Sequence, residues 1–307
     1  MDQVKANSER AGRAESRNRS RRRQSALISL TVEKRLVWEV PVWPITIAPW
    51  VLRGMILPVN PSVAELFEII YEERELLVIN KPAGLVCHPT KTDEYSSLIS
   101  RARLHLGPGS RPHLVNRLDR ETSGVTLVAK DLETARELRR IWESRQVEKD
   151  YLAIVHGQVR EAHGVIDAPL GKDEHSRVAI KDCVRPDGAG ASTEYWVQQW
   201  FTHHQLSFTF LLVRPRTGRK HQIRIHLAHI GHPVVGDKLY GGDEDLYLAL
   251  VEDRLTPEQR RRLILPHHAL HAREVRFQWR GRETVYHAEP EPWFARFQLL
   301  SHGLNTD

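Results

Sequence analysis

One stretch, residues 113–129, most limits how this chain folds. Its first part, His113–Gly124, is polar and rich in turn-forming residues, and it leads directly into the apolar, β-branched run Val125–Ala129. This order predicts a loop that enters a buried strand. Loops at strand ends are where a rigid scaffold presents its reactive groups. Any chemistry is therefore expected at this point of the chain.

Asp119 is the candidate for chemistry in this loop. It stands between Arg117 and Arg120, whose guanidinium groups are expected to keep its carboxylate ionised at neutral pH. On these residues alone, a surface loop with an ion-paired aspartate is the simpler interpretation. Arg117–Gly124, however, resembles the RLDxxTSG catalytic motif of the RluA-type pseudouridine synthases, enzymes that isomerise uridine in RNA to its C-glycoside.

Further segments resemble motifs of the same family and occur in the family's order. They are Lys81–Pro89, Glu148–Gly157, Thr217–Leu227 and Leu270–Phe277. The first is interpreted as architectural, with His88 packed or hydrogen-bonded. Because the motifs agree in order as well as in residues, the chain is identified as a member of this family from about Phe67 to Phe277.

The resemblance implies three catalytic residues. Asp119 acts on the sugar, either as a nucleophile or as a base that removes a proton. Arg224 pairs with Asp119 and orients it, and Tyr151 stacks on the target base and takes part in proton transfer. The reaction involves no redox change and no energy source, so no cofactor is expected. Asn116 departs from the family, in which many members have histidine before the Arg-Leu-Asp.

Contacts to RNA are expected from other polar residues of these motifs. The candidates are Arg117, Arg120, Lys149, Arg219 and His221. Arginines also occur along a predicted helix over residues 131–145, where a solvated face is the simplest interpretation. The expected partner is ribosomal or transfer RNA, and a monomer is the default.

Two other classes of protein compete with the synthase. The alternative is a non-catalytic RNA-binding protein on the same scaffold, but the presence of all three catalytic residues disfavours it. A metal-dependent hydrolase would need a ligand set, for which His221, His226 and His229 are the candidates. Their spacing is not that of HExxH, and no acidic residue lies among them, so no metal is expected.

Charge is concentrated at the start of the chain. Residues 1–23 carry eight Lys and Arg against three Asp and Glu, which is most of the net charge of +6. Residues 1–26 are therefore expected to be a basic disordered tail, with nonspecific RNA contact as its favoured role. Residues 27–66 are expected to be an N-terminal extension without the helical pattern of an S4 RNA-binding domain. The catalytic domain is predicted over residues 67–307.

The composition favours a protein of a reducing compartment. Cys87 and Cys183 are the only two cysteines and lie far apart, which argues against a disulfide framework. No apolar run is long enough to span a membrane, and no secretory signal is evident. The cytoplasm is the expected location.

The resemblance implies an α+β fold: a mixed, mainly antiparallel curved sheet with flanking helices and a central cleft. The sequence patterns indicate where several elements lie. Hairpin strands are predicted at Phe67–Tyr71 and Leu76–Asn80, and a strand at Phe208–Val213. Helices are predicted at Leu98–Leu106, at residues 131–145 with Asp131 as N-cap, at residues 244–265 with a helix start at Thr256–Gln259, and at Pro292–Phe297.

Overall fold

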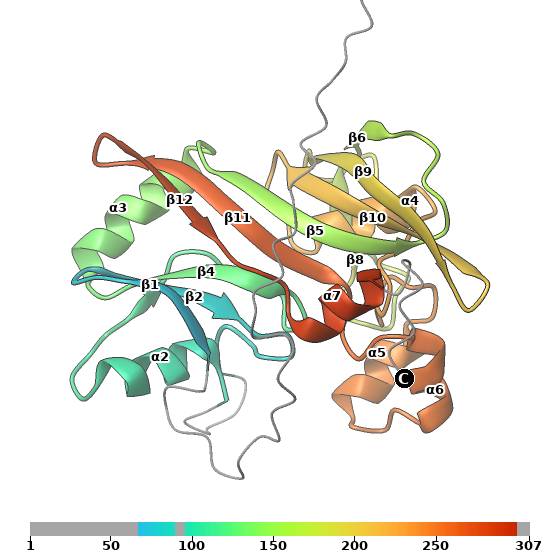
Figure 1. Ribbon diagram of the computed structural model, residues 1–307, viewed down its shortest axis with the longest axis horizontal. Coiled ribbons are helices and arrows are strands. Elements are labelled where there is room, and N and C mark those ends of the chain that lie inside the picture. The colour runs from blue at the N-terminus through green and yellow to red at the C-terminus, as the bar shows by residue number, and fades with distance from the viewer. Residues whose placement is uncertain (1–66, 90–95, 300–307) are drawn as a thin grey trace, which may run out of the picture. The chain divides into compact units, whose positions relative to one another are not determined.

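A computed structural model describes residues 67–89 and 96–299, which are built around one large β-sheet (Figure 1). The basic tail 1–26 and the extension 27–66 lie outside the described residues, so both remain predictions. Among the residues described, no helix has the length and apolar character needed to span a bilayer.

The sheet has ten strands in the order β1-β2-β4-β11-β5-β10-β9-β6, with β3 beside β4 and β12 beside β11. Their bounds are β1 Glu68–Glu72, β2 Leu76–Lys81, β3 His113–Leu114, β4 Ser123–Ala129, β5 Glu148–His156, β6 His163–Asp167, β9 Ser192–His203, β10 Leu206–Pro215, β11 Leu270–Trp279 and β12 Arg282–His287. Two short strands, β7 Leu170–Lys172 and β8 Asp182–Val184, pair separately. Strands β4 and β11 are parallel, and the other neighbours are antiparallel. The predicted mixed, mainly antiparallel sheet is confirmed.

Helices flank this sheet. Their bounds are α2 Leu98–Leu106, α3 Leu132–Glu143, α4 Gln222–His229, α5 Asp245–Val251, α6 Pro257–Leu263 and α7 Pro292–Leu299. The predicted N-cap of α3 is confirmed, since Asp131 Oδ1 accepts a hydrogen bond from the Thr134 amide at 2.8 Å. The region predicted to be helical over residues 244–265 contains two helices, α5 and α6. The predicted helix start at Thr256 is confirmed, since Thr256 forms a capping box with Gln259.

Packing of α4 decides which of its side chains face the loop before β4. Ile223 and Leu227 are buried in the larger apolar cluster, together with residues of β5 and β10. Arg224, one position beyond Ile223, is therefore turned away from that contact. This packing directs the Arg224 guanidinium toward the loop that contains Asp119.

Gly124 is required where this loop becomes β4. Residues Ser123 and Gly124 pair in parallel with His271 and Ala272 of β11. Gly124 has φ +114°, and a Cβ atom there would lie 2.1 Å from the carbonyl oxygen of Ala272. Only glycine allows the two strands to approach this closely. The glycine of the TSG motif thus fixes the end of the loop against the centre of the sheet.

Candidate active site

A basic cavity of about 850 Å³ opens over the centre of the sheet. Its walls come from residues 115–119, from β5, from residues 215–224 and from the end of α3. Seven lysine and arginine side chains line it, against the two carboxylates of Asp119 and Glu143. Such a cavity attracts a polyanion.

Asp119 lies in this cavity with 27% of its side chain exposed. Its Oδ2 accepts a hydrogen bond from Arg224 Nη1 at 2.8 Å, and its Oδ1 lies 3.7 Å from His221 Nε2. Burial alone would raise the pKa of Asp119, but the attraction of Arg224 and its hydrogen bond outweigh burial, so that pKa is lowered. The carboxylate is therefore ionised at neutral pH and open to a ligand.

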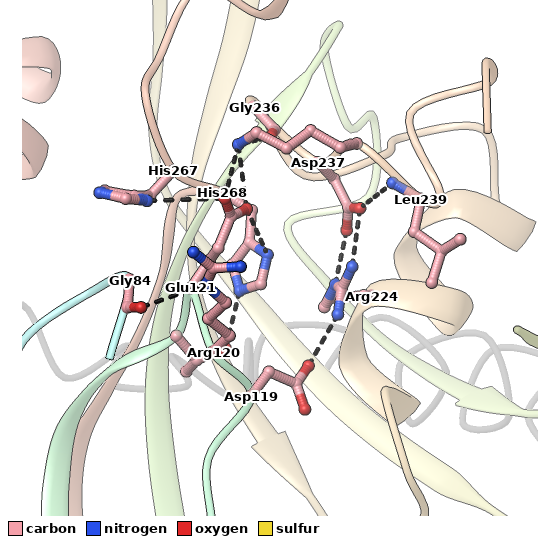
Figure 2. Close-up of polar contacts among 12 residues, drawn as sticks. Gly84, Asp119, Arg120, Glu121, Arg224, Gly236, Asp237, Leu239, His267 and His268 are labelled. Carbon is pink, nitrogen blue, oxygen red and sulfur yellow. Dashed lines mark hydrogen bonds and ion pairs between the residues drawn. The ribbon is translucent and has the colours of Figure 1, made fainter. Parts of the chain in front are cut away.

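The sequence neighbours of Asp119 do not provide this charge, contrary to expectation. Among the described residues, no ion pair joins Arg117 or Arg120 to Asp119. Arg120 instead donates from Nε to the carbonyl oxygen of Gly84 at 3.2 Å (Figure 2). Arg120 and Glu121 form a turn in which the Thr122 amide donates to the Asp119 carbonyl at 3.2 Å, and the partner of the Asp119 carboxylate comes from α4. The pairing of Asp119 with Arg224 that the resemblance implied is confirmed, whereas Arg117 and Arg120 are not its partners.

Arg224 bridges two carboxylates (Figure 2). Its Nε and Nη2 donate to Asp237 at 2.6 and 2.8 Å, which leaves Nη1 for Asp119. Asp237 is fully buried and also accepts from the amides of Leu239 and Tyr240. Burial opposes the charge of Arg224, but the attraction of Asp237 raises its pKa further above the ordinary value. The guanidinium is thus charged and fixed in orientation.

Asp237 was missed as a site residue by sequence reasoning. It lies 13 positions after Arg224 and follows a glycine, in a segment that the family resemblance covers but to which no role was assigned. A buried aspartate can be recognised as a site residue only when its partner is known. The sequence does not show that Asp237 pairs with Arg224.

His221 and Tyr240 complete the surroundings of Arg224. The Tyr240 ring lies under the guanidinium, 5.0 Å from centroid to Cζ, in a cation–π contact. His221 Nδ1 is 2.9 Å from the Tyr240 hydroxyl, and burial lowers the pKa of His221. A neutral imidazole that accepts from Tyr240 has its Nε2–H directed toward Asp119. His221 therefore lies beside the candidate carboxylate, which extends its predicted role as an RNA contact.

Tyr151 lies on β5, in the lining of the same cavity. It is partly buried and packs against the larger apolar cluster. Burial and the charge of Asp119 both raise the pKa of Tyr151, so the phenol is neutral at neutral pH. Its ring offers an aromatic surface within the cavity, as the resemblance implied.

A second buried ion pair holds the loop behind Asp119. Lys238 Nζ lies 2.8 Å from Glu121 Oε1 and also donates to the carbonyl oxygens of Gly236 and Pro266 (Figure 2). The consecutive residues Asp237 and Lys238 thus hold the loop at two points, through Arg224 and through Glu121. Gly236 permits this, since a Cβ atom there would lie 2.4 Å from the His267 carbonyl oxygen.

Asn116 anchors the start of the loop. Its Oδ1 accepts from the Leu127 amide at 2.8 Å, and its Nδ2 donates to the Val125 carbonyl at 3.1 Å. The side chain therefore pairs with β4 as a strand residue would, one step beyond the β3–β4 pairing. At the position where histidine was expected, the asparagine side chain thus joins the loop to β4 through two hydrogen bonds.

Replacing Asn116 with alanine is expected to destabilise the protein by about 2 kcal/mol, because two hydrogen bonds of roughly 1 kcal/mol each are lost. Urea unfolding measures this change. Asn116→Asp keeps the acceptor for Leu127 but places a carboxylate oxygen against the Val125 carbonyl, so it should cost at least as much as alanine. Equal stability of all three proteins would contradict the anchoring role.

The structure separates the five RNA-contact candidates into two groups. Arg117, Lys149, Arg219 and His221 line the cavity, whereas Arg120 is exposed outside its lining. His88, interpreted from the sequence as packed or hydrogen-bonded, is exposed at the cavity wall. Its interpretation as a packed residue is wrong, because the Lys81–Pro89 turn brings it to the surface.

No metal site accompanies these residues. Within residues 67–89 and 96–299, no group of three or more His, Cys, Asp or Glu side chains is arranged to hold a metal ion. His226 is buried between Thr193 and the Ala168 carbonyl, and His229 is exposed. The three histidines considered as ligands therefore lie in different environments and do not face a common point.

Two buried histidines behind the loop make the fold sensitive to acid. His271 Nε2 donates to the Ala288 carbonyl and its Nδ1 accepts from Ser123, while His268 Nε2 lies 2.7 Å from Thr122 Oγ1. Burial lowers the pKa of each to about 4. The unfolded chain takes up these protons near pH 6.5, and the native fold does not.

Stability is therefore expected to fall as the pH falls from about 6.5 toward 4, by about 1.4 kcal/mol per pH unit for each histidine. Urea unfolding at pH 7.5, 6 and 5 measures the slope before most carboxylates titrate. His271→Gln should remove about half of it. A stability that does not change between pH 7.5 and 5 would show that these histidines are not held neutral.

Comparisons with known proteins identify the family of this chain. A sequence model of the RNA pseudouridylate synthase family matches residues 75–229, half of the chain. An uncharacterized RNA pseudouridine synthase of Aquifex aeolicus is 40% identical over 179 residues, which cover 56% of this chain and 55% of that protein. A ribosomal large subunit pseudouridine synthase D of Pseudomonas aeruginosa is 37% identical over 216 residues, covering 67% and 62%.

A solved structure gives the same result for the fold. Human RNA pseudouridylate synthase domain containing 1 aligns with a TM-score of 0.59 at 27% identity, over 76% of this chain and 86% of that one. The chain belongs to the RNA pseudouridylate synthase family, in the branch that the RluA-type resemblance indicated. The match spans little more than half the length of the curated relatives.

Proposed function

We propose that the protein isomerises uridine in RNA to pseudouridine and that Asp119 carries out the chemistry at the sugar. The observation that carries this proposal is an ionised, partly exposed carboxylate held by a buried guanidinium inside a basic cavity. The ribosomal names of several relatives make ribosomal RNA the first substrate to test, with transfer RNA second. The reaction takes place in the cytoplasm in this proposal, with the protein as a monomer.

The reaction breaks the N1–C1′ bond of uridine and forms a C5–C1′ bond to the same uracil. The base rotates between the two steps, C5 loses its proton, and N1 gains one, so the product is an isomer. Asp119 either attacks C1′ as a nucleophile or removes a proton from the sugar as a base. Both routes require the ionised carboxylate, which the charge of Arg224 favours.

Arg224 and Tyr151 support Asp119 in different ways. Arg224 Nη1 holds Oδ2 and leaves Oδ1 of Asp119 for the substrate. The aromatic ring of Tyr151 is placed to stack on a uracil that has left its helix, because a base cannot react while stacked. Its neutral hydroxyl is available for proton transfer to the detached base.

Basic side chains of the cavity are proposed to bind the RNA around the target. Arg117, Lys149, Arg219 and His221 line the cavity and are suited to phosphate or base contacts. Arg120, outside the lining, is proposed to contact the RNA backbone only. No metal or cofactor takes part in this proposal.

Purified protein incubated with total RNA in EDTA tests the proposal, with pseudouridine measured by mass spectrometry of nucleosides. The expected result is pseudouridine formation that persists in EDTA. RNA binding without pseudouridine would favour the non-catalytic alternative, and activity lost in EDTA would favour a metal-dependent enzyme.

A further inference from the structure

The cavity around Asp119 extends across the sheet to the end of α3. Its lining joins the start of α4, the strand β5 and residues 142–147. Helix α3 packs beside β4 and β11, and α4 beside β9 and β10, with β5 between them in the sheet. Figure 1 shows the two helices on opposite sides of β5. A target uridine has to reach only Asp119 and Tyr151, so the α3 end is left for another part of the ligand.

Trp142 provides an aromatic wall at this end. It is partly buried and packs edge-to-face on Phe277, with ring centroids 5.1 Å apart and an angle of 62° between the rings. The remaining surface of Trp142 lines the cavity. An aromatic ring that is held at a fixed angle in a basic cavity is suited to stack on an unpaired base.

Two cations accompany Trp142. Arg145 lines the cavity just after α3, and Lys149 lines it from β5, with its ammonium on the side of Gly218. No carboxylate among the described residues forms an ion pair with either. By contrast, Arg214 and Arg216 nearby are paired with Asp150 and Glu194. Lys149 lies two residues before Tyr151, on the same face of β5, about 7 Å along the strand. Unpaired cations at this spacing are placed for phosphate groups next to the target.

The backbone of Arg145 supports the same conclusion. It has φ +59° just after the C-cap of α3, at a position where glycine is the usual residue because a side chain is strained there. A strained arginine at the rim of a cavity indicates that its side chain serves a purpose other than ending the helix.

We propose that Trp142, Arg145 and Lys149 form a subsite for the nucleotide next to the target uridine, with its base on Trp142 and its phosphate on the two cations. This inference rests on the proposed function. It defines the substrate as a uridine with an unpaired neighbour, in a loop or bulge of the RNA.

The test uses a short stem-loop RNA that contains a uridine modified by the unaltered protein. Trp142→Leu keeps apolar bulk against Phe277 but cannot stack, so KM for this RNA should rise about tenfold at unchanged kcat. Trp142→Tyr should stay within threefold of the unaltered protein. Trp200→Leu is the matched control, since Trp200 is half exposed on β9 and outside the cavity, and it should change neither constant.

Arg145→Gly separates binding from stability. Glycine relieves the strained backbone, so the urea midpoint of unfolding should rise while RNA affinity falls. The slope of log Kd against log salt should decrease by about 0.7 for Arg145→Gly and for Lys149→Gln.

Fluorescence identifies the neighbour directly. In complexes with Asp119→Asn protein, 2-aminopurine on one side of the target should be quenched, and Trp142→Leu should remove the quenching. Turnover of the unaltered protein with an unchanged KM in Trp142→Leu would reject the subsite and leave the proposed function standing. Failure of the unaltered protein to form pseudouridine in any RNA would overturn both.

Discussion

Asp119→Asn is expected to reduce pseudouridine formation by at least about 10⁴-fold, roughly 5.4 kcal/mol of transition-state stabilisation. Asparagine has the same size and still accepts a hydrogen bond from Arg224, but it is neither a nucleophile nor a base. In the proposed function the basic cavity and Tyr151 hold the RNA, so its Kd should change by less than about threefold.

Single-turnover kinetics with a stem-loop RNA measure this effect, and filter binding measures the affinity. Asp243→Asn is the matched control, because Asp243 forms an exposed ion pair with Arg262 and should leave turnover unchanged. Because the pKa of Asp119 is already lowered, the rate should show no titration of this carboxylate between pH 6 and 8. Substantial turnover by Asp119→Asn protein would contradict the assigned role.

Asp237→Asn is expected to lower kcat by about 10²- to 10³-fold, roughly 3 to 4 kcal/mol, while KM for RNA changes little. Asp237 touches no substrate and acts by fixing Arg224, whose Nη1 orients Asp119. An asparagine amide would direct a donor at a guanidinium donor, so one of the two hydrogen bonds is lost. Breaking this buried pair should also destabilise the protein by roughly 3 to 5 kcal/mol.

Kinetics well below the unfolding temperature separate the two effects. Asp173→Asn, which removes the charge of an ion pair with Lys181 outside the cavity, is the control and should retain full kcat. A purely structural role for Asp237 would lower the fraction of active protein without changing kcat per folded molecule. That outcome, established by active-site titration, would show that Asp237 does not position Arg224.

Helix positions and helix N-caps could be predicted from the sequence, because they depend on residues that are close together in the chain. Helix α2 was predicted over the residues it occupies, and the Asp131 cap of α3 and the Thr256 start of α6 follow from side chains that bond backbone amides three residues away. These interactions are complete within a few residues of sequence, so they need no knowledge of the fold.

Pairings across the chain were not predictable from local chemistry. The loop aspartate was expected to rely on Arg117 and Arg120, but its charge is balanced by Arg224, 105 positions away. The family resemblance supplied Arg224, and it supplied neither Asp237 nor the Glu121–Lys238 pair. Those contacts exist because the sheet brings residues 236–238 behind the loop, and a carboxylate in a sequence does not indicate which distant cation will reach it.

The central claim is that this chain forms pseudouridine through Asp119. Chemical mapping of pseudouridine in RNA from cells with the unaltered protein, with Asp119→Asn protein, or with neither tests it most directly. A position modified only with the unaltered protein is the expected result, and it would identify the target at the same time. Identical maps in all three, together with no pseudouridine formed by purified protein on RNA from the cells without it, would contradict the claim.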